Sequence, residues 1–158
     1  MDRERASRLG VALAAGVLII VGCTTTASPS PKAGGGGPTT VVVTVQEWAV
    51  LAAPDSAPAG DITFDVTNDG PEDIHEFVVI KTDLDAGDLP TDADGVVDEA
   101  GGRMEVIDEI EDIPVGEITS LTLALDAGDY VLICNIWDAD DGEAHYRLGM
   151  RTAFSVTD

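Results

Sequence analysis

The chain has 158 residues, a length typical of one domain rather than two. Its 30 acidic and 8 basic residues give a formal net charge of −22, which excludes a nucleic-acid partner because phosphate binding needs a basic patch. Hydrophobic residues make up 44% of the chain, more than a disordered acidic tail would carry. With two Cys and two His, the chain can build neither a disulfide framework nor a centre that binds several metal ions through many imidazoles.

Residues 1–22 predict an export signal. Three Arg in the first eight residues precede an apolar run over residues 9–21, which is shorter than the ~20 apolar residues of a spanning helix. A charged start, a short apolar stretch and small residues at its end are typical of a secretory signal peptide. The residues IVGC at positions 20–23 resemble the lipobox of bacterial and archaeal lipoproteins, in which the Cys is lipidated. We therefore predict a lipid anchor on Cys23 at the outer face of the cell membrane. The alternative is an ordinary signal peptide with an incidental Cys.

Residues 23–39 are rich in Ser, Thr, Pro and Gly. Such a composition cannot bury a core and is typical of a flexible linker. We predict that this segment is a tether that holds a folded domain, residues 40–158, away from the membrane.

From residue 40 onward, alternating or β-branched runs separated by turns predict short strands. The clearest pattern covers residues 61–66, where Ile62, Phe64 and Val66 share one face. The other expected strands span residues 41–45, 76–80, 121–125, 130–136 and 152–156. Many short strands with Gly-containing and Pro-containing turns predict an all-β sandwich.

Residues 83–112 differ from the rest of the domain because they are acidic and show little strand pattern. Their apolar residues recur every three positions, a spacing that allows a helical turn or an irregular crossover; they are Met104, Ile107, Ile110 and Ile113. We expect an acidic insertion with one short helix and one strand.

The rarest residues are the best candidates for chemistry. With Cys23 assigned to lipid, Cys134 is an unpaired thiol at the end of an apolar run, and a free Cys is most often a small core residue. His75, His145 and Met150 each have an equally ordinary explanation, as surface, capping or core residues. Taken together, two imidazoles, one thiolate and one weak thioether are the donor set of a trigonal blue-copper electron-transfer site.

At these residues the sequence resembles the cupredoxin family over residues 40–158. The resemblance rests on Asn68 and His75 ahead of an apolar strand, on the segment AGDYVLIC that ends at Cys134, and on His145 and Met150 separated by four residues before a final strand. It implies a cupredoxin-like Greek-key β-sandwich that holds one copper ion, Cu(I) or Cu(II). It also implies that His75, Cys134 and His145 are equatorial ligands, that Met150 is the weak axial ligand, and that Asn68 and Asn135 support the ligand loops.

The ten residues between Cys134 and His145 make this loop longer than is usual in the family. The loop is acidic and contains Gly, so it brings carboxylates near the expected metal. One alternative is therefore a tetrahedral Zn²⁺ site with Asp138 or Glu143 as the fourth ligand. Another alternative is a sandwich that binds no metal.

The resemblance implies an electron carrier rather than an enzyme, with no small-molecule substrate. In the family, electrons pass through the side of the second His, here His145, whose imidazole edge reaches the surface. The acidic surface would steer a basic redox partner protein toward it. Two alternatives remain: a copper acquisition or delivery protein, which the long loop would favour, and a metal-free interaction module on the cell surface.

Overall fold

The computed structural model describes residues 37–158, and the expected signal peptide, the lipidated Cys23 and most of the tether lie outside these residues. The described elements are β1 (Thr39–Gln46), β2 (Ala49–Ala53), β3 (Ser56–Pro58), β4 (Gly60–Asn68), β5 (His75–Thr82), β6 (Met104–Ile113), β7 (Ile118–Leu125), β8 (Gly128–Ile133), β9 (Trp137–Asp138), β10 (Glu143–Ala144), α1 (His145–Leu148) and β11 (Arg151–Thr157). No helix of this part of the chain is long and apolar enough to cross a membrane.

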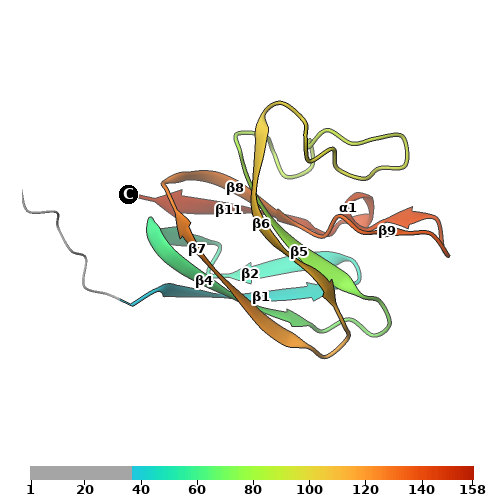
Figure 1. Ribbon diagram of the computed structural model, residues 1–158, viewed down its shortest axis with the longest axis horizontal. Helices are drawn as coiled ribbons and strands as arrows, with labels where there is room; N and C mark the ends of the chain where they lie inside the picture. Colours follow the sequence, from blue (N-terminus) through green and yellow to red (C-terminus); the bar gives the residue numbers. More distant parts are fainter. Residues whose placement is uncertain (1–36) are drawn as a thin grey trace, which may run out of the picture. The chain divides into compact units, whose positions relative to one another are not determined.

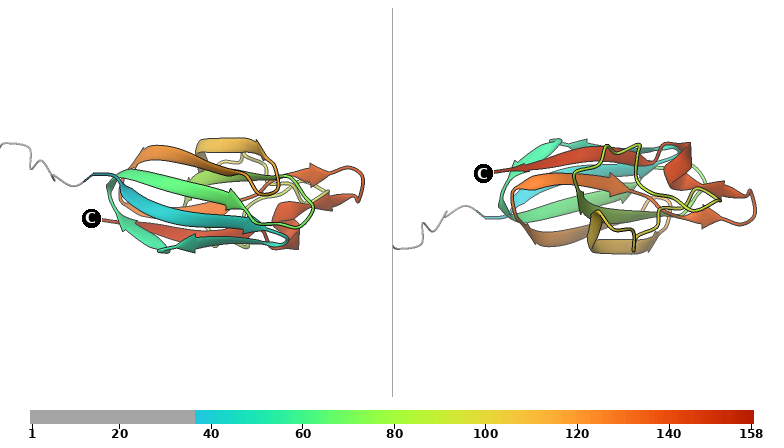
Figure 2. Two further views of the ribbon diagram at one scale, coloured as in Figure 1. Left: turned by 90° about the horizontal axis from the view of Figure 1, so that it is seen from below. Right: turned by 90° about the horizontal axis from the view of Figure 1, so that it is seen from above.

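The strands form two layers, as Figures 1 and 2 show. One sheet has the strand order β2-β1-β4-β7, and the other has the order β3-β11-β8-β5-β6. The pairs β1/β4 and β11/β3 are parallel, whereas the other pairs within the two sheets are antiparallel. The expected β-sandwich is therefore confirmed.

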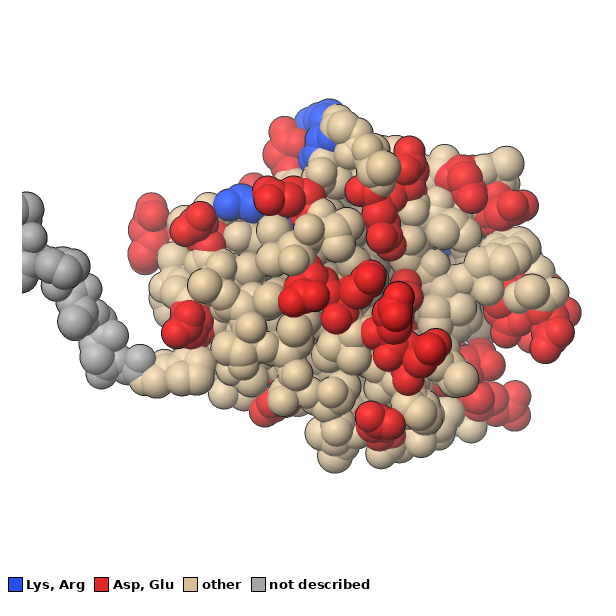
Figure 3. All heavy atoms as spheres, viewed as in Figure 1, with Lys and Arg blue, Asp and Glu red and all other residues tan. Residues whose placement is uncertain are grey.

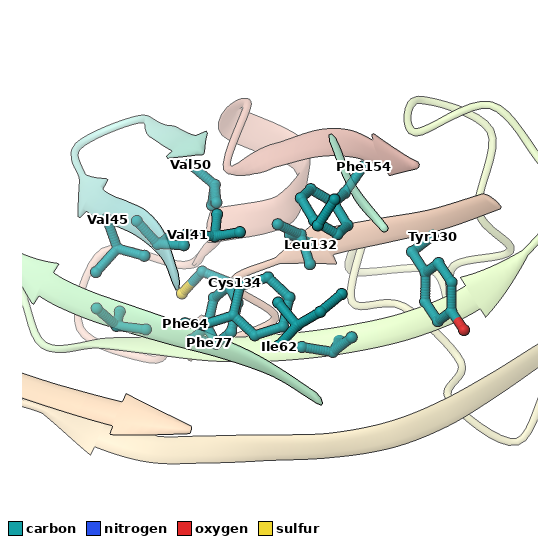
Figure 4. Close-up of a cluster of buried hydrophobic side chains, with 14 of the residues drawn as sticks. Val41, Val45, Val50, Ile62, Phe64, Phe77, Tyr130, Leu132, Cys134 and Phe154 are labelled. Carbon is teal, nitrogen blue, oxygen red and sulfur yellow. The ribbon is translucent and has the colours of Figure 1, made fainter. Parts of the chain in front are cut away.

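The core lies between the two sheets and follows the alternation of the sequence. Ile62, Phe64 and Val66 of β4 are fully buried, while their neighbours on the strand are more exposed. Their side chains meet those of the opposite sheet, where Phe77 and Phe154 pack against Phe64 with ring centroids 5.4 Å apart in each pair. Figure 4 shows this cluster, which also includes Cys134.

A second layer of the protein covers the outer faces of strands β5 and β8. Both faces of these strands therefore carry apolar side chains. Residues Val78 and Ile80 of β5 face away from the main core and pack with Val131, Leu89 and Val97. The last two belong to the long connection between β5 and β6, residues 83–103, which folds back over the sheet. A strand that is buried on both faces has a continuous apolar run rather than an alternating one.

The expectation of a short helix in the acidic insertion was wrong. The described chain has no helix between β5 and β6, and the residues spaced by three belong to the ten-residue strand β6. The pairing of β6 with β5 is interrupted by two register shifts: between Phe77 and His75 of β5, and again between Ile80 and Val79, β6 has one extra residue. Met104 packs in the outer cluster, whereas Ile107, Ile110 and Ile113 pack in the main core, so the spacing of three does not mark a single face.

Strand β6 lies at the edge of its sheet, with β5 on one side only. Its exposed residues are all acidic: Glu105, Asp108, Glu109, Glu111 and Asp112. Figure 3 shows that carboxylates are spread over the viewed face, with Lys and Arg confined to its upper margin.

Candidate metal centre

Three candidate ligands come from three elements that meet at one end of the sandwich. His75 is the first residue of β5, Cys134 directly follows β8, and His145 is the first residue of α1. Because β5 and β8 pair antiparallel, the start of β5 lies beside the end of β8. The backbone N–H of His145 donates to the carbonyl of Ile136 at 2.9 Å, which brings the third ligand back to the other two.

The donor atoms of these three residues form a small triangle. Nδ1 of His75 lies 3.3 Å from Nδ1 of His145, and Sγ of Cys134 lies 3.9 Å from the first and 3.4 Å from the second. A point inside a triangle with these edges is about 2.1 Å from all three corners, close to the ~2.0–2.1 Å of Zn–N bonds and slightly short of the ~2.3 Å of Zn–S bonds. The triangle therefore has the size that one transition-metal ion needs.

Burial and hydrogen bonding support the same interpretation. All three residues are at most 1% exposed, and Nε2 of each imidazole is buried with no hydrogen-bond partner among the residues that the structure describes. Burial lowers the pKa of both His side chains, so both rings are neutral at pH 7 and have lone pairs for a metal. Burial also raises the pKa of Cys134 to about 12, so its thiolate needs a cation beside it to form at neutral pH.

Met150 lies at the same end of the fold, directly before β11. It is fully buried in the core cluster that contains Cys134. Its carbonyl accepts the N–H of Cys134 at 3.1 Å, and its own N–H donates to the carbonyl of His145 at 3.1 Å. The backbone of Met150 is thus bonded directly to two of the three candidate ligands.

The long Cys134–His145 loop has a regular structure. It forms the hairpin β9–β10, in which Trp137 pairs with Ala144 and Asp138 with Glu143. The carboxylate of Asp138 accepts the N–H of Asp140 at 2.7 Å and so closes the turn. Neither Asp138 nor Glu143 belongs to the group of potential ligands around His75, Cys134 and His145 in the described chain.

Asn68 holds the chain that leads to His75. Its amide Nδ2 donates to the carbonyls of Asp73 and Ile113, both at 2.8 Å, and its Oδ1 accepts the N–H of Gly70 at 2.9 Å. Asn68 is fully buried, so its amide makes these three hydrogen bonds within the protein. The amide therefore fixes the turn before β5 against the end of β6.

Asn135 connects the Cys134 side of the site to the acidic connection between β5 and β6. Its side chain accepts the N–H of Val97 at 2.6 Å and donates to the carbonyl of Val97 and to the carboxylate of Glu99. Its backbone N–H donates to Glu76 at 2.6 Å, while the N–H of Glu76 donates to Sγ of Cys134 at 3.4 Å. The acidic insertion therefore holds Asn135, the residue that follows Cys134, in place.

Two residues of the turn between β1 and β2 also reach the site, and the sequence analysis did not identify them. Glu47 places its carboxylate 3.9 Å from Nε2 of His75, and the ring of Trp48 packs against the ring of His145. Burial raises the pKa of Glu47. Hydrogen bonds from the N–H groups of Asp73 and Glu72, together with the nearby His75, outweigh this effect, so the net pKa is below its usual value. No local sequence pattern marks these two residues, because their contacts span at least 25 residues of chain.

The expected exposed edge of His145 is not found. His145 is 1% exposed and lines the floor of a pocket of about 420 Å³ beneath the β9–β10 hairpin. The pocket is walled by acidic and apolar side chains, namely Glu72, Asp73, Asp112, Asp138, Ile74, Ile136, Trp137 and Ala139. The ring of His145 is therefore covered by aromatic and loop residues rather than open to solvent.

No family model matches the sequence, and no curated protein matches it significantly. Solved structures do match. A dithionite-reduced auracyanin from the photosynthetic bacterium Roseiflexus castenholzii is 22% identical, with a TM-score of 0.55 over 78% of this chain and 100% of its own. Auracyanin B is 21% identical, with a TM-score of 0.51 over 76% of this chain and 89% of its own.

A third similar structure is auracyanin A, described as a blue copper protein from the green thermophilic photosynthetic bacterium Chloroflexus aurantiacus. It is 20% identical, with a TM-score of 0.51 over 77% of this chain and 100% of its own. At this level of identity the likeness concerns the arrangement of the strands, which is that of the cupredoxins. The chain accordingly has the cupredoxin fold, as its sequence predicts.

Proposed function

We propose that this protein is a mononuclear blue-copper electron carrier. His75, Cys134 and His145 are its equatorial ligands, and Met150 is its weak axial ligand. The observation that supports this proposal most strongly is the buried triangle of two Nδ1 atoms and one Sγ atom, with edges of 3.3, 3.4 and 3.9 Å. Two imidazoles and a thiolate in trigonal geometry select copper and allow it to exchange one electron between Cu(II) and Cu(I).

Copper suits the site better than zinc. A structural Zn²⁺ site is usually closed by a fourth strong ligand in a tetrahedron. The carboxylates of the β9–β10 hairpin do not join the triangle, whereas Met150, a soft donor, is buried in the cluster that contains Cys134. One of the similar structures is also described as a blue copper protein.

Electron transfer suits the site better than copper delivery or catalysis. A delivery protein must open its site, but here both strands of the β9–β10 hairpin are hydrogen-bonded and all three ligands are buried. The fixed ligand positions limit rearrangement between the two oxidation states. We assign the protein no catalytic residue, since an electron carrier converts no substrate.

We further propose that lipid on Cys23 holds the domain at the outer face of the cell membrane, with residues 23–39 as the tether. The partner is a redox protein with a basic docking surface. Four carboxylates line the pocket over His145, and the chain has a net charge of −22, so a basic partner would be attracted and correctly oriented.

Titration of the purified chain with Cu(II) tests the proposal. The wild-type chain is expected to bind one ion and to develop an intense visible band from sulfur-to-copper charge transfer. Cys134→Ser should abolish the band, whereas His75→Ala and His145→Ala should each weaken binding or change the spectrum by admitting water.

Ser155→Ala is a suitable control because Ser155 lies on β11 outside the donor triangle. A chain that folds normally but gives no visible band would indicate a metal-free module. A band that survives removal of either His would show that this His is not a ligand. Release of copper to an acceptor protein without reversible reduction would favour delivery.

A further inference from the structure

The carboxylate of Glu47 is buried although its residue lies in a turn. Only 12% of the side chain is exposed, and the carboxylate points inward beneath the segment that leads to His75. Gly70 makes room for it, because a Cβ at that position would overlap Oε2 of Glu47. An ionised carboxylate loses hydration when it is buried, so it needs donors or positive charge nearby.

One oxygen of Glu47 has such donors and the other does not. Oε1 accepts the N–H of Asp73 at 2.8 Å and the N–H of Glu72 at 3.2 Å. Within residues 37–158, Oε2 is buried with no partner, and Nε2 of His75 is also buried with no partner. Nε2 lies near this carboxylate, since Oε1 is 3.9 Å away, somewhat beyond hydrogen-bond distance.

The orientation of the His75 ring decides where its proton must be. Nδ1 faces Sγ of Cys134 and Nδ1 of His145, so Nδ1 is the atom that would bind a metal. A neutral imidazole has one N–H, and a ring that binds a metal through Nδ1 has its proton on Nε2. That N–H is a donor aimed away from the metal, and histidine ligands in proteins usually donate it to a carboxylate or a carbonyl.

We propose that Glu47 is the acceptor for Nε2–H of His75 and acts as a positioning residue for the metal centre. This inference rests on the proposed function, in which His75 binds copper. The carboxylate fixes the tautomer and the angle of the ring, and its negative charge makes the imidazole a stronger donor. The negative charge stabilises Cu(II) more than Cu(I), because Cu(II) carries the larger positive charge.

A purely structural role for Glu47 predicts a different result, and substitutions can distinguish it from the proposed role in positioning His75. If Glu47 only held the turn before His75, an uncharged acceptor at Oε1 would serve the N–H groups of Glu72 and Asp73 equally well. Glu47→Gln keeps that oxygen and the side-chain length but removes the charge. Asp69→Asn is the matched control, because it removes one charge from the turn before His75 at an exposed position outside the pocket over His145.

The experiment compares the copper-loaded wild-type chain with Glu47→Gln and Asp69→Asn. In the reduced, diamagnetic proteins, the Nε2–H proton of His75 is observed by NMR. We expect a strongly downfield, slowly exchanging signal in the wild type and in Asp69→Asn, and an upfield shift in Glu47→Gln. At a fixed applied potential, the ratio of Cu(I) to Cu(II) should rise about tenfold in Glu47→Gln, equivalent to about 59 mV for one electron.

Each outcome is decisive. If Glu47→Gln matches Asp69→Asn in both the NMR signal and the Cu(I)/Cu(II) ratio, Glu47 does not act on the metal centre. If Glu47→Gln fails to fold, the wild-type spectrum decides, since an Nε2–H that exchanges rapidly with water overturns the proposal. If the folded wild-type chain binds no copper, the proposed function itself is wrong, which is distinguishable from failure of Glu47 alone.

Discussion

The indole ring of Trp48 packs edge-on against the imidazole ring of His145, with centroids 5.0 Å apart and ring planes at 67°. His145 is almost completely buried, whereas Trp48 is 37% exposed. Trp48, which packs against the candidate ligand His145, is therefore partly exposed to solvent, whereas His145 is not. If electrons leave the site on the His145 side, Trp48 is the side chain that a partner protein would touch.

Replacement of Trp48 should slow electron exchange without changing the copper site itself. Trp48→Leu is expected to slow self-exchange several-fold, because it removes the ring that extends from His145 toward solvent. Trp48→Phe should retain most of the rate. The rate is measured by NMR line broadening in mixtures of reduced and oxidised protein. Trp137→Leu is the control, since Trp137 is similarly exposed and lines the pocket over His145. Slower electron self-exchange in Trp137→Leu alone would show that electrons pass through the β9–β10 hairpin instead.

Met150 should set the reduction potential rather than the affinity for copper. Met150→Leu removes the thioether and keeps the site apolar, which disfavours Cu(II), so the potential should rise with copper retained. Met150→Gln supplies a harder oxygen donor that favours Cu(II), so the potential should fall. Potentiometric titration measures both changes.

The alternatives for Met150 predict other results. If Met150 only fills the core, both variants should change the free energy of unfolding, Gln more than Leu because a buried amide needs partners, and the potential should hardly move. If a carboxylate of the hairpin is the axial ligand, changes at Asp138 or Glu143 should shift the visible band while changes at Met150 do not.

Metal uptake should release one proton from Cys134. Burial raises the pKa of this thiol to about 12, so the metal-free protein carries the proton at neutral pH and must lose it to form the thiolate ligand. Both imidazoles are already neutral, because burial lowers the pKa of each. Higher pH therefore favours binding, and the apparent affinity should rise about tenfold per pH unit between roughly pH 7 and 10. Proton release in weakly buffered solution measures this; release of no proton would show that Cys134 is not a thiolate ligand.

Membrane attachment can be tested on the native protein. If Cys23 is lipidated, the protein should fractionate with membranes, and Cys23→Ser should release it or block its processing. Cys134→Ser is the control because Cys134 lies in the core of the folded domain. A mature protein that is recovered in the soluble fraction with an unmodified Cys23 would contradict the proposal.

Some of the fold follows directly from local pattern. The alternation of Ile62, Phe64 and Val66 predicts a strand with one buried face, and β4 has that face. The apolar run from residue 76 to residue 80 predicts a strand, and β5 spans it, covered on one face by the main core and on the other by residues 83–103. These patterns are sufficient because each strand's own side chains record which of its faces are buried.

Other parts could not be predicted because they depend on contacts between distant segments. The bulges in β6 change its periodicity only where it pairs with β5, so the sequence of β6 alone is ambiguous. The same holds for the site. Cys134, His75 and His145 are rare residues that attract attention, but Glu47 is one of many acidic residues, and its contact with His75 exists only in the folded chain.

The acidic edge strand β6 has a consequence for how molecules of this protein behave when crowded. An unpaired strand edge offers backbone N–H and C=O groups to any other extended chain, and copies held in a membrane plane would meet edge to edge far more often than copies free in solution. The row of carboxylates on β6 makes such encounters repulsive. Salt screens this repulsion, and at high ionic strength the same edge becomes the site where self-association begins.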